Sequence, residues 1–188
     1  MKIALIGSHG VGKTTLCFEL AAALKRRSAD VEMVREVARR CPLPINQETT
    51  VAAQEWILHT QIAWEIDAAA NSEVVLCDRS VLDNYCYLVH AAGSLRAWES
   101  FIDHWLPTYD FLVHVPISEH PSYDGVRAVD PSLQQLVDVL LEGMIAARGL
   151  KPLRLEATDR EKWCDTIVEA LLPTLEPTLP LFEGDSVS

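Results

Sequence analysis

The residues best suited to chemistry stand near the start of the chain, in the stretch GSHGVGKTTL. The pattern G-x-x-x-x-G-K-[ST] is completed there by Gly7, Gly12, Lys13 and Thr14. Glycines allow a tight loop whose main-chain N–H groups converge on phosphate oxygens, and the following helix presents the positive end of its dipole to the same anion. In this pattern the lysine reaches the β- and γ-phosphates and the hydroxyl ligates Mg²⁺. The stretch therefore predicts a site for a nucleoside triphosphate with magnesium.

We expect the whole loop to contact the nucleotide, which we take to be ATP. The predicted ATP-binding residues are Ser8, His9, Gly10, Val11, Gly12, Lys13, Thr14 and Thr15. His9 is expected to contribute mainly its backbone N–H.

Two acidic residues follow further apolar segments and extend the predicted site. Glu36 follows VEMVR and Asp78 follows EVVLC. Because the carboxyl ends of parallel strands meet at one edge of a sheet, both acids are expected beside the phosphate loop. Phosphoryl transfer needs a base for the attacking hydroxyl and an anchor for the metal. We predict that Glu36 and Asp78 divide these roles, with Thr14 and Asp78 as metal ligands, and leave open which acid is the base. The alternatives are a helix N-cap at Asp78 and a surface ion pair at Glu36.

Basic and polar side chains near the same strand ends are candidates for substrate contacts. Arg127, in the loop sequence DGVR, is predicted to neutralise charge on the transferring phosphate. The helical stretch 50–70 is expected to form one wall of an acceptor pocket. The candidate substrate-binding residues are Arg39, Gln61, Arg79, Asp83 and Tyr85. Solvent-exposed positions for Gln61 and for the arginines are the alternative.

These residues must be positioned by alternating strands and helices. Strands are expected at KIALI, VEMV, EVVLCD, DFLVHV and LRLEA, and helices at 13–28, 50–70, 82–92, 95–105, 132–148 and in DREKWCDTIVEALL. This alternation predicts an α/β protein with a parallel sheet and right-handed crossovers. We expect three α/β/α layers around a five-stranded parallel sheet of order 2-3-1-4-5. Residues 1–172 are predicted to form a single domain, followed by an irregular tail at 173–188.

The composition bears on partners and location. The formal net charge is −11, and such an average field repels nucleic acid. Arginines gathered within an acidic surface suit a small anionic ligand better. No apolar run approaches the roughly 20 residues of a membrane span, and the N-terminus is too short for a signal peptide. We therefore expect a cytoplasmic protein with no membrane contact, and leave a homodimer open.

Several segments together resemble a known family. REVAR after the second strand, CDRSVLDNYCY at the third and YDGVRAVDP before a late helix look like the small P-loop kinases related to the ribosylnicotinamide kinase domain of bifunctional NAD-biosynthesis regulators. The D-R-S step is also similar to the acid–arginine–serine step of deoxynucleoside kinases, in which an acid after the second strand is the general base. The resemblance covers about residues 1–172 and implies a P-loop NTPase fold.

Carried onto this chain, the resemblance implies Glu36 as the candidate base and Asp78 as the metal-side acid, with an exchange of roles left open. It implies that Arg79 touches substrate or phosphate and that Arg127 is a lid arginine. The leading hypothesis is an ATP- and Mg²⁺-dependent kinase for a hydroxyl of a small acceptor, best matched by a nucleoside or nucleoside-like molecule. The alternatives are a regulatory P-loop ATPase that acts through a protein partner and a polynucleotide 5′-kinase.

Overall fold

The computed structural model describes residues 1–45, 49–117 and 131–175. Five strands form one sheet: β1 (Lys2–Ile6), β2 (Val31–Val34), β3 (Val74–Asp78), β4 (Phe111–His114) and β5 (Leu153–Arg154). Their order is β2-β3-β1-β4-β5, and every neighbouring pair is parallel. The predicted five-stranded parallel sheet and its strand order are therefore confirmed.

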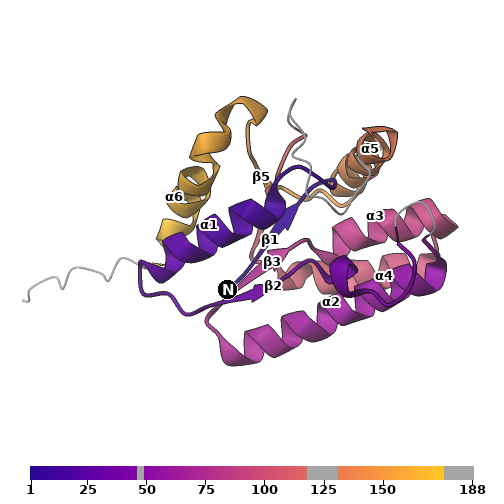
Figure 1. Ribbon diagram of the computed structural model, residues 1–188, viewed down its shortest axis with the longest axis horizontal. Coiled ribbons are helices and arrows are strands. Elements are labelled where there is room, and N and C mark those ends of the chain that lie inside the picture. Colours follow the sequence, from indigo (N-terminus) through magenta and orange to yellow (C-terminus); the bar gives the residue numbers. More distant parts are fainter. Residues whose placement is uncertain (46–48, 118–130, 176–188) are drawn as a thin grey trace, which may run out of the picture.

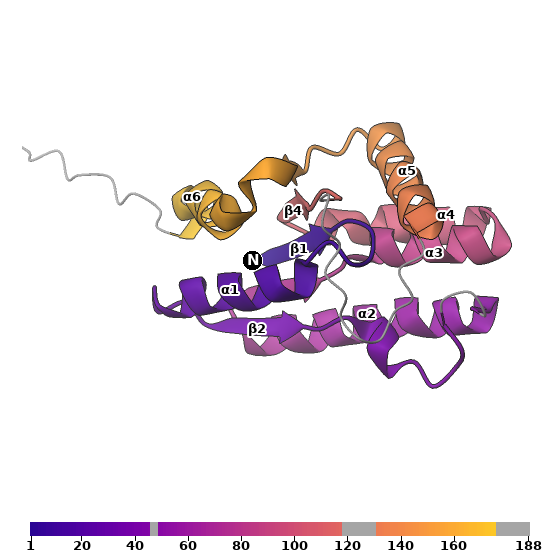
Figure 2. The same cartoon turned by 45° about the horizontal axis from the view of Figure 1, so that its top comes forward.

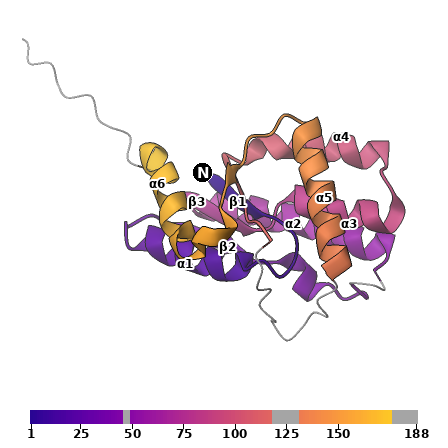
Figure 3. The same cartoon turned by 90° about the horizontal axis from the view of Figure 1, so that it is seen from above.

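Helices cover both faces of this sheet, which gives the three predicted layers (Figure 1). The α-helices are α1 (Lys13–Lys25), α2 (Val51–Asn71), α3 (Val81–Ala92), α4 (Arg96–Trp105), α5 (Pro131–Ala147) and α6 (Trp163–Leu175). Short 3-10 helices are η1 (Val37–Arg40), η3 (Leu106–Thr108) and η4 (Ala157–Lys162). Seen from above, α1 and α6 lie together on one side, and α3, α4 and α5 gather on the other (Figure 3).

The central strand β1 is buried along its whole length because its side chains alternate between two cores. Ile3 and Leu5 pack in a cluster with α1 and α6. Ala4 and Ile6 pack in a second cluster with α2, α3 and α5. This double burial fixes the register of β1, and thereby the position of the loop that leaves its carboxyl end.

The carboxyl ends of β1, β2 and β3 lead directly into the segments that carry the candidate chemistry. β1 leads to the glycine loop and α1, β2 to η1, and β3 to α3. Figure 2 shows α1 and β2 side by side, with η1 and the start of α2 next in the chain. The parallel arrangement therefore brings these three connections to one edge of the sheet.

The C-terminal part differs in detail from the expected pattern. The segment expected as one helix from Asp159 begins as η4, in which Asp159 has non-helical φ and ψ of −109° and 34°. α6 starts only at Trp163 and continues through Pro173 to Leu175, so the first residues of the predicted tail are helical. The rest of the tail and Arg127 lie outside the described residues. None of the helices described has the length and apolar character needed to cross a bilayer.

Candidate active site

The glycine loop has a backbone that few other residues could adopt. Gly7 has φ 148° and Gly12 has φ 94°, both in a region that L-residues rarely occupy. A Cβ on Gly7 would lie 2.5 Å from the carbonyl O of Val115. The N–H of Gly7 donates to Asp83 Oδ1 at 2.8 Å, which ties the start of the loop to α3. The loop therefore needs glycine for conformation and for space.

Lys13, the first residue of α1, folds back over this loop. Its Nζ donates to the carbonyl O of Gly7 at 2.8 Å and of Ser8 at 2.5 Å. The side chain is buried, and burial together with the nearby charge of Arg79 lowers the pKa of Lys13 to about 7. A polyphosphate could replace the two carbonyls as partner of Nζ and supply negative charge.

Thr14 and Asp78 form the second element of the site. Thr14 Oγ1 donates to Asp78 Oδ2 at 2.6 Å. Burial raises the pKa of Asp78, while the hydrogen bond from Thr14 and the charge of Lys13 oppose that rise. The hydroxyl and carboxylate oxygens are donors of the type that Mg²⁺ prefers, so the residues present fit the metal that the fold implies. The N-cap of α3 is Ser80, so the alternative role of Asp78 as that cap does not apply.

Glu36 lies at the carboxyl end of β2 and is only 5% exposed. Its Oε1 accepts from Arg79 Nε at 2.9 Å, and its Oε2 accepts from Arg39 Nε at 2.8 Å. The alternative of a surface ion pair holds only for Arg39, whose side chain is 38% exposed, because Glu36 and its second partner Arg79 are both buried. The guanidinium of Arg79 also lies over the ring of Tyr87, 5.2 Å from its centroid. The result is an oriented carboxylate between two arginines.

These groups line a common cavity of about 350 Å³. The predicted site residues that line it are Gly10, Gly12, Lys13, Thr14, Thr15, Glu36, Arg39, Asp78 and Arg79. Phe18, Met33 and Arg35 complete its lining. The structure therefore brings together the phosphate loop, the two acids and two of the arginines.

Three predicted substrate-binding residues have structural tasks away from this cavity. Tyr85 is fully buried in the core cluster under α3. Asp83 completes the capping box of α3 with Ser80, besides accepting from Gly7. Gln61 is buried in α2, and its Nε2 donates to Glu65 Oε1 and to the carbonyl O of Arg79. The predicted alternative of an exposed Gln61 is therefore wrong.

The remaining loop residues support the loop rather than line the cavity. Val11 packs into the core with α1. His9 Nδ1 lies 3.1 Å from the hydroxyl of Tyr87, and its carbonyl O accepts from Gln134 Nε2. The Oγ of Ser8 is buried and has no hydrogen-bond partner in the described part of the chain.

Arg160 was not among the predicted site residues. Its Nη2 lies 2.7 Å from the position that a Cβ on Gly12 would take. A second, larger cavity of about 1020 Å³ runs from Gly12 and Thr15 to η4, where Arg160 and Lys162 line it. A signal was present, because TDREKW follows the fifth strand and so belongs to the same edge of the sheet.

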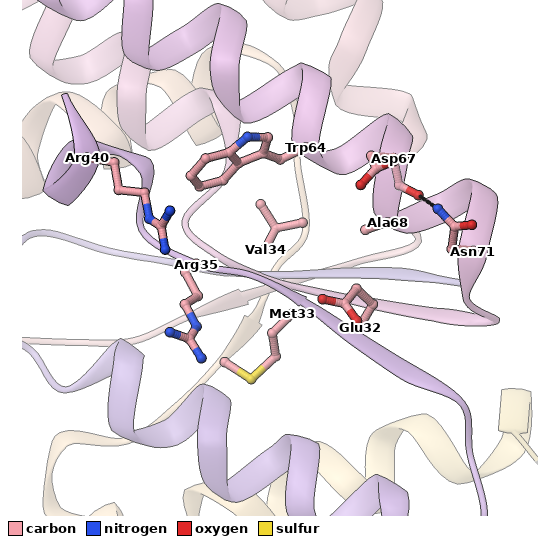
Figure 4. Close-up of a pocket in the computed structure, with 9 residues that line it drawn as sticks. All are labelled: Glu32, Met33, Val34, Arg35, Arg40, Trp64, Asp67, Ala68 and Asn71. Carbon is pink, nitrogen blue, oxygen red and sulfur yellow. Dashed lines mark hydrogen bonds between the residues drawn. The ribbon is translucent and has the colours of Figure 1, made fainter. Parts of the chain in front are cut away.

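A third cavity, of about 490 Å³, lies between β2 and α2 (Figure 4). Trp64 faces the strand from α2, and the guanidinium of Arg40 lies over its ring, 5.8 Å from the centroid. Met33 and Arg35 line this cavity as well as the first one. No residue of the glycine loop lines it, so its walls lack the amides that bind a polyphosphate.

A sheet of order 2-3-1-4-5 with a glycine loop between β1 and α1 defines the P-loop class of nucleoside-triphosphate-binding proteins. Within that class, a family model described as an AAA domain matches residues 2–162. The chain therefore belongs to this family. No curated protein matches it.

Two of the solved structures similar to this chain are of one enzyme. One is deoxyadenosine kinase from M. mycoides with dCMP and a flexible dCDP bound, at a TM-score of 0.64 and 17% identity. The other is the same enzyme with bound dATP, at a TM-score of 0.63 and 17% identity. Each match covers 91% of this chain and 98% of the other.

Proposed function

We propose that the protein is an ATP- and Mg²⁺-dependent kinase that transfers the γ-phosphate to a hydroxyl of a small acceptor, a nucleoside or nucleoside-like molecule. The observation that carries the proposal is the buried Glu36–Arg79 pair in the same cavity as the phosphate loop. A carboxylate oriented in this way is what deprotonation of an acceptor hydroxyl requires. The M. mycoides deoxyadenosine kinase binds deoxynucleotides on the same fold, which supports an acceptor of this kind.

The phosphate loop and Lys13 are assigned to the triphosphate. Thr14 and Asp78 would hold Mg²⁺, which when bound neutralises charge on the phosphate oxygens. The larger cavity between α1 and η4 suits the nucleoside part of ATP, because it meets the phosphate loop at Gly12. Arg160, which covers Gly12, is then a candidate contact to the nucleotide.

Glu36 is assigned as the base because Asp78, beside Thr14, is assigned to the metal. The O–H bond of the acceptor breaks as its oxygen bonds the γ-phosphorus, the proton passes to the Glu36 carboxylate, and ADP departs with the electrons of the broken P–O bond. Arg79 Nη1 is buried without a hydrogen-bond partner in the described residues, which leaves a donor for the acceptor or the transferred group. Arg127, outside the described residues, stays a candidate for the same charge.

The alternative of a regulatory ATPase is favoured by the description of the matching family as an AAA domain. Phosphorylation of polynucleotide ends is opposed by the net charge of −11. We also propose that the protein acts in the cytoplasm, alone or as a homodimer.

The test measures ADP formation from ATP, with and without a panel of nucleosides, nucleotides and sugars. A kinase hydrolyses ATP slowly alone and gains rate with its acceptor, which appears as a phosphorylated product. Lys13→Ala is expected to abolish that product, because the β- and γ-phosphates lose their cation. A rate indifferent to every acceptor would support the regulatory ATPase instead.

A further inference from the structure

Glu65 of α2 is a fully buried carboxylate at the centre of a hydrogen-bond network. Its Oε2 accepts from Lys2 Nζ at 3.1 Å and from Trp105 Nε1 at 2.8 Å. Its Oε1 accepts from the Tyr109 hydroxyl at 2.7 Å and from Gln61 Nε2 at 2.8 Å. One cation and three neutral donors compensate the cost of burying this charge. Burial of a carboxylate is unfavourable enough to need an explanation, and Glu65 lines none of the three cavities described above.

Two of these donors lead from Glu65 to the residues that follow β3. Gln61 Nε2 also donates to the carbonyl O of Arg79 at 3.2 Å. The Tyr109 hydroxyl, while donating to Glu65, accepts from the N–H of Val81 at 3.0 Å. Gln61 and Tyr109 therefore connect Glu65 to the main chain on both sides of Ser80, where α3 begins beside α2 (Figure 1). We call these two connections the arms.

The main chain is strained at the point that these arms hold. Arg79 has φ 102°, a value that is unfavourable for a non-glycine residue and persists only where the surroundings impose it. The amide of Gln61 cannot flip, because both partners of its Nε2 are acceptors. Its Oε1 has no hydrogen-bond partner in the described residues. The amide orientation is therefore the one that satisfies the two hydrogen bonds from Nε2 and leaves Oε1 unpaired.

We propose that Gln61 and Glu65 are positioning residues that, together with Tyr109, hold Arg79 in its left-handed conformation and so align its guanidinium with Glu36. Without the arms, residue 79 relaxes to an ordinary φ and its side chain leaves the carboxylate. A displacement of about 1 Å in a group near the reaction costs up to about 100-fold in rate. The inference rests on the proposed kinase function only for its kinetic consequence.

The structural test follows the Nε–H signal of Arg79 by NMR in the full chain, assigned by its loss in Arg79→Lys. Gln61→Leu and Tyr109→Phe each remove one arm. Trp105→Phe is the matched control, because it removes one hydrogen bond to the same carboxylate but lies on neither arm. Slow exchange of the signal is expected in the wild type and in Trp105→Phe, and rapid exchange in both arm variants.

The kinetic test uses the same variants. We expect the arm variants to lower kcat by about 10- to 100-fold and to change KM for ATP far less, because Asp83 still accepts from the N–H of Gly7 and holds the phosphate loop. Retention of the Arg79 signal and of kcat in both arm variants overturns the proposal, and so does an equal loss in Trp105→Phe, which would mean general destabilisation. If Gln61→Leu fails to fold, Tyr109→Phe decides alone. If the wild type phosphorylates no acceptor, the proposed function fails, while the NMR result still decides the positioning role.

Discussion

Binding of ATP should take up a proton at Lys13. In the free protein, burial and the charge of Arg79 lower the pKa of Lys13 to about 7. A bound triphosphate brings negative charge to Nζ and raises that pKa again. At pH 8 a group with a pKa near 7 is only ~10% protonated, so forming the ammonium ion in the complex takes up about 0.9 proton. At pH 6 the group is already ~90% protonated, and the uptake falls to about 0.1 proton.

Calorimetry measures this uptake directly. A non-hydrolysable ATP analogue with Mg²⁺ is titrated into the protein in buffers of different ionisation enthalpy, and the slope of the observed heat against that enthalpy gives the protons bound. Lys13→Arg is the matched control, because guanidinium stays charged and any remaining slope belongs to other groups. A slope near zero at pH 8 in the wild type refutes the reasoning, as does an equal slope in Lys13→Arg.

Glu36→Gln and Asp78→Asn should each lower turnover at least about 100-fold, the usual scale for a general base, with folding checked by circular dichroism. A near wild-type rate in either variant removes that residue from the mechanism. Gly7→Ala should lower the free energy of unfolding by more than about 1 kcal/mol, because the new Cβ meets the carbonyl O of Val115 at 2.5 Å. Gly143→Ala is its control: a Cβ there meets nothing within 4 Å inside α5, so denaturant unfolding should show equal or greater stability. Equal losses in the two variants would contradict the steric reason.

The sheet could be predicted from the sequence because its signals are local. KIALI and EVVLC are short apolar runs, which are typical of strands buried on both faces of a sheet. The glycine loop and Asp78 could be predicted for the same reason, since each directly follows such a run, and Glu36 comes two residues after the strand VEMV. Parallel pairing then brings Glu36 and Asp78 together without further information.

The roles of the side chains expected to bind an acceptor could not be predicted in this way, because their orientation is set by tertiary packing. Gln61 and Tyr85 lie on helices whose buried faces depend on which neighbours cover them. The sequence does not distinguish a buried glutamine that binds a ligand from one that donates to a main-chain carbonyl. Arg160 was missed because η4 replaces the first turns of the expected helix and directs the residue toward Gly12.

Asp83 shows why the phosphate loop and the turn that carries Arg79 form one unit. Its Oδ1 holds the N–H of Gly7, and its Oδ2 holds the N–H and hydroxyl of Ser80, the residue next to Arg79. A single buried carboxylate thus joins the start of the phosphate loop to the turn that carries Arg79. A shift of either segment would break hydrogen bonds that have no water to replace them, which costs about 1–3 kcal/mol for each group left unpaired. The distance between the phosphate loop and Arg79 is therefore fixed by the fold before any ligand binds, which is the preorganisation that phosphoryl transfer requires.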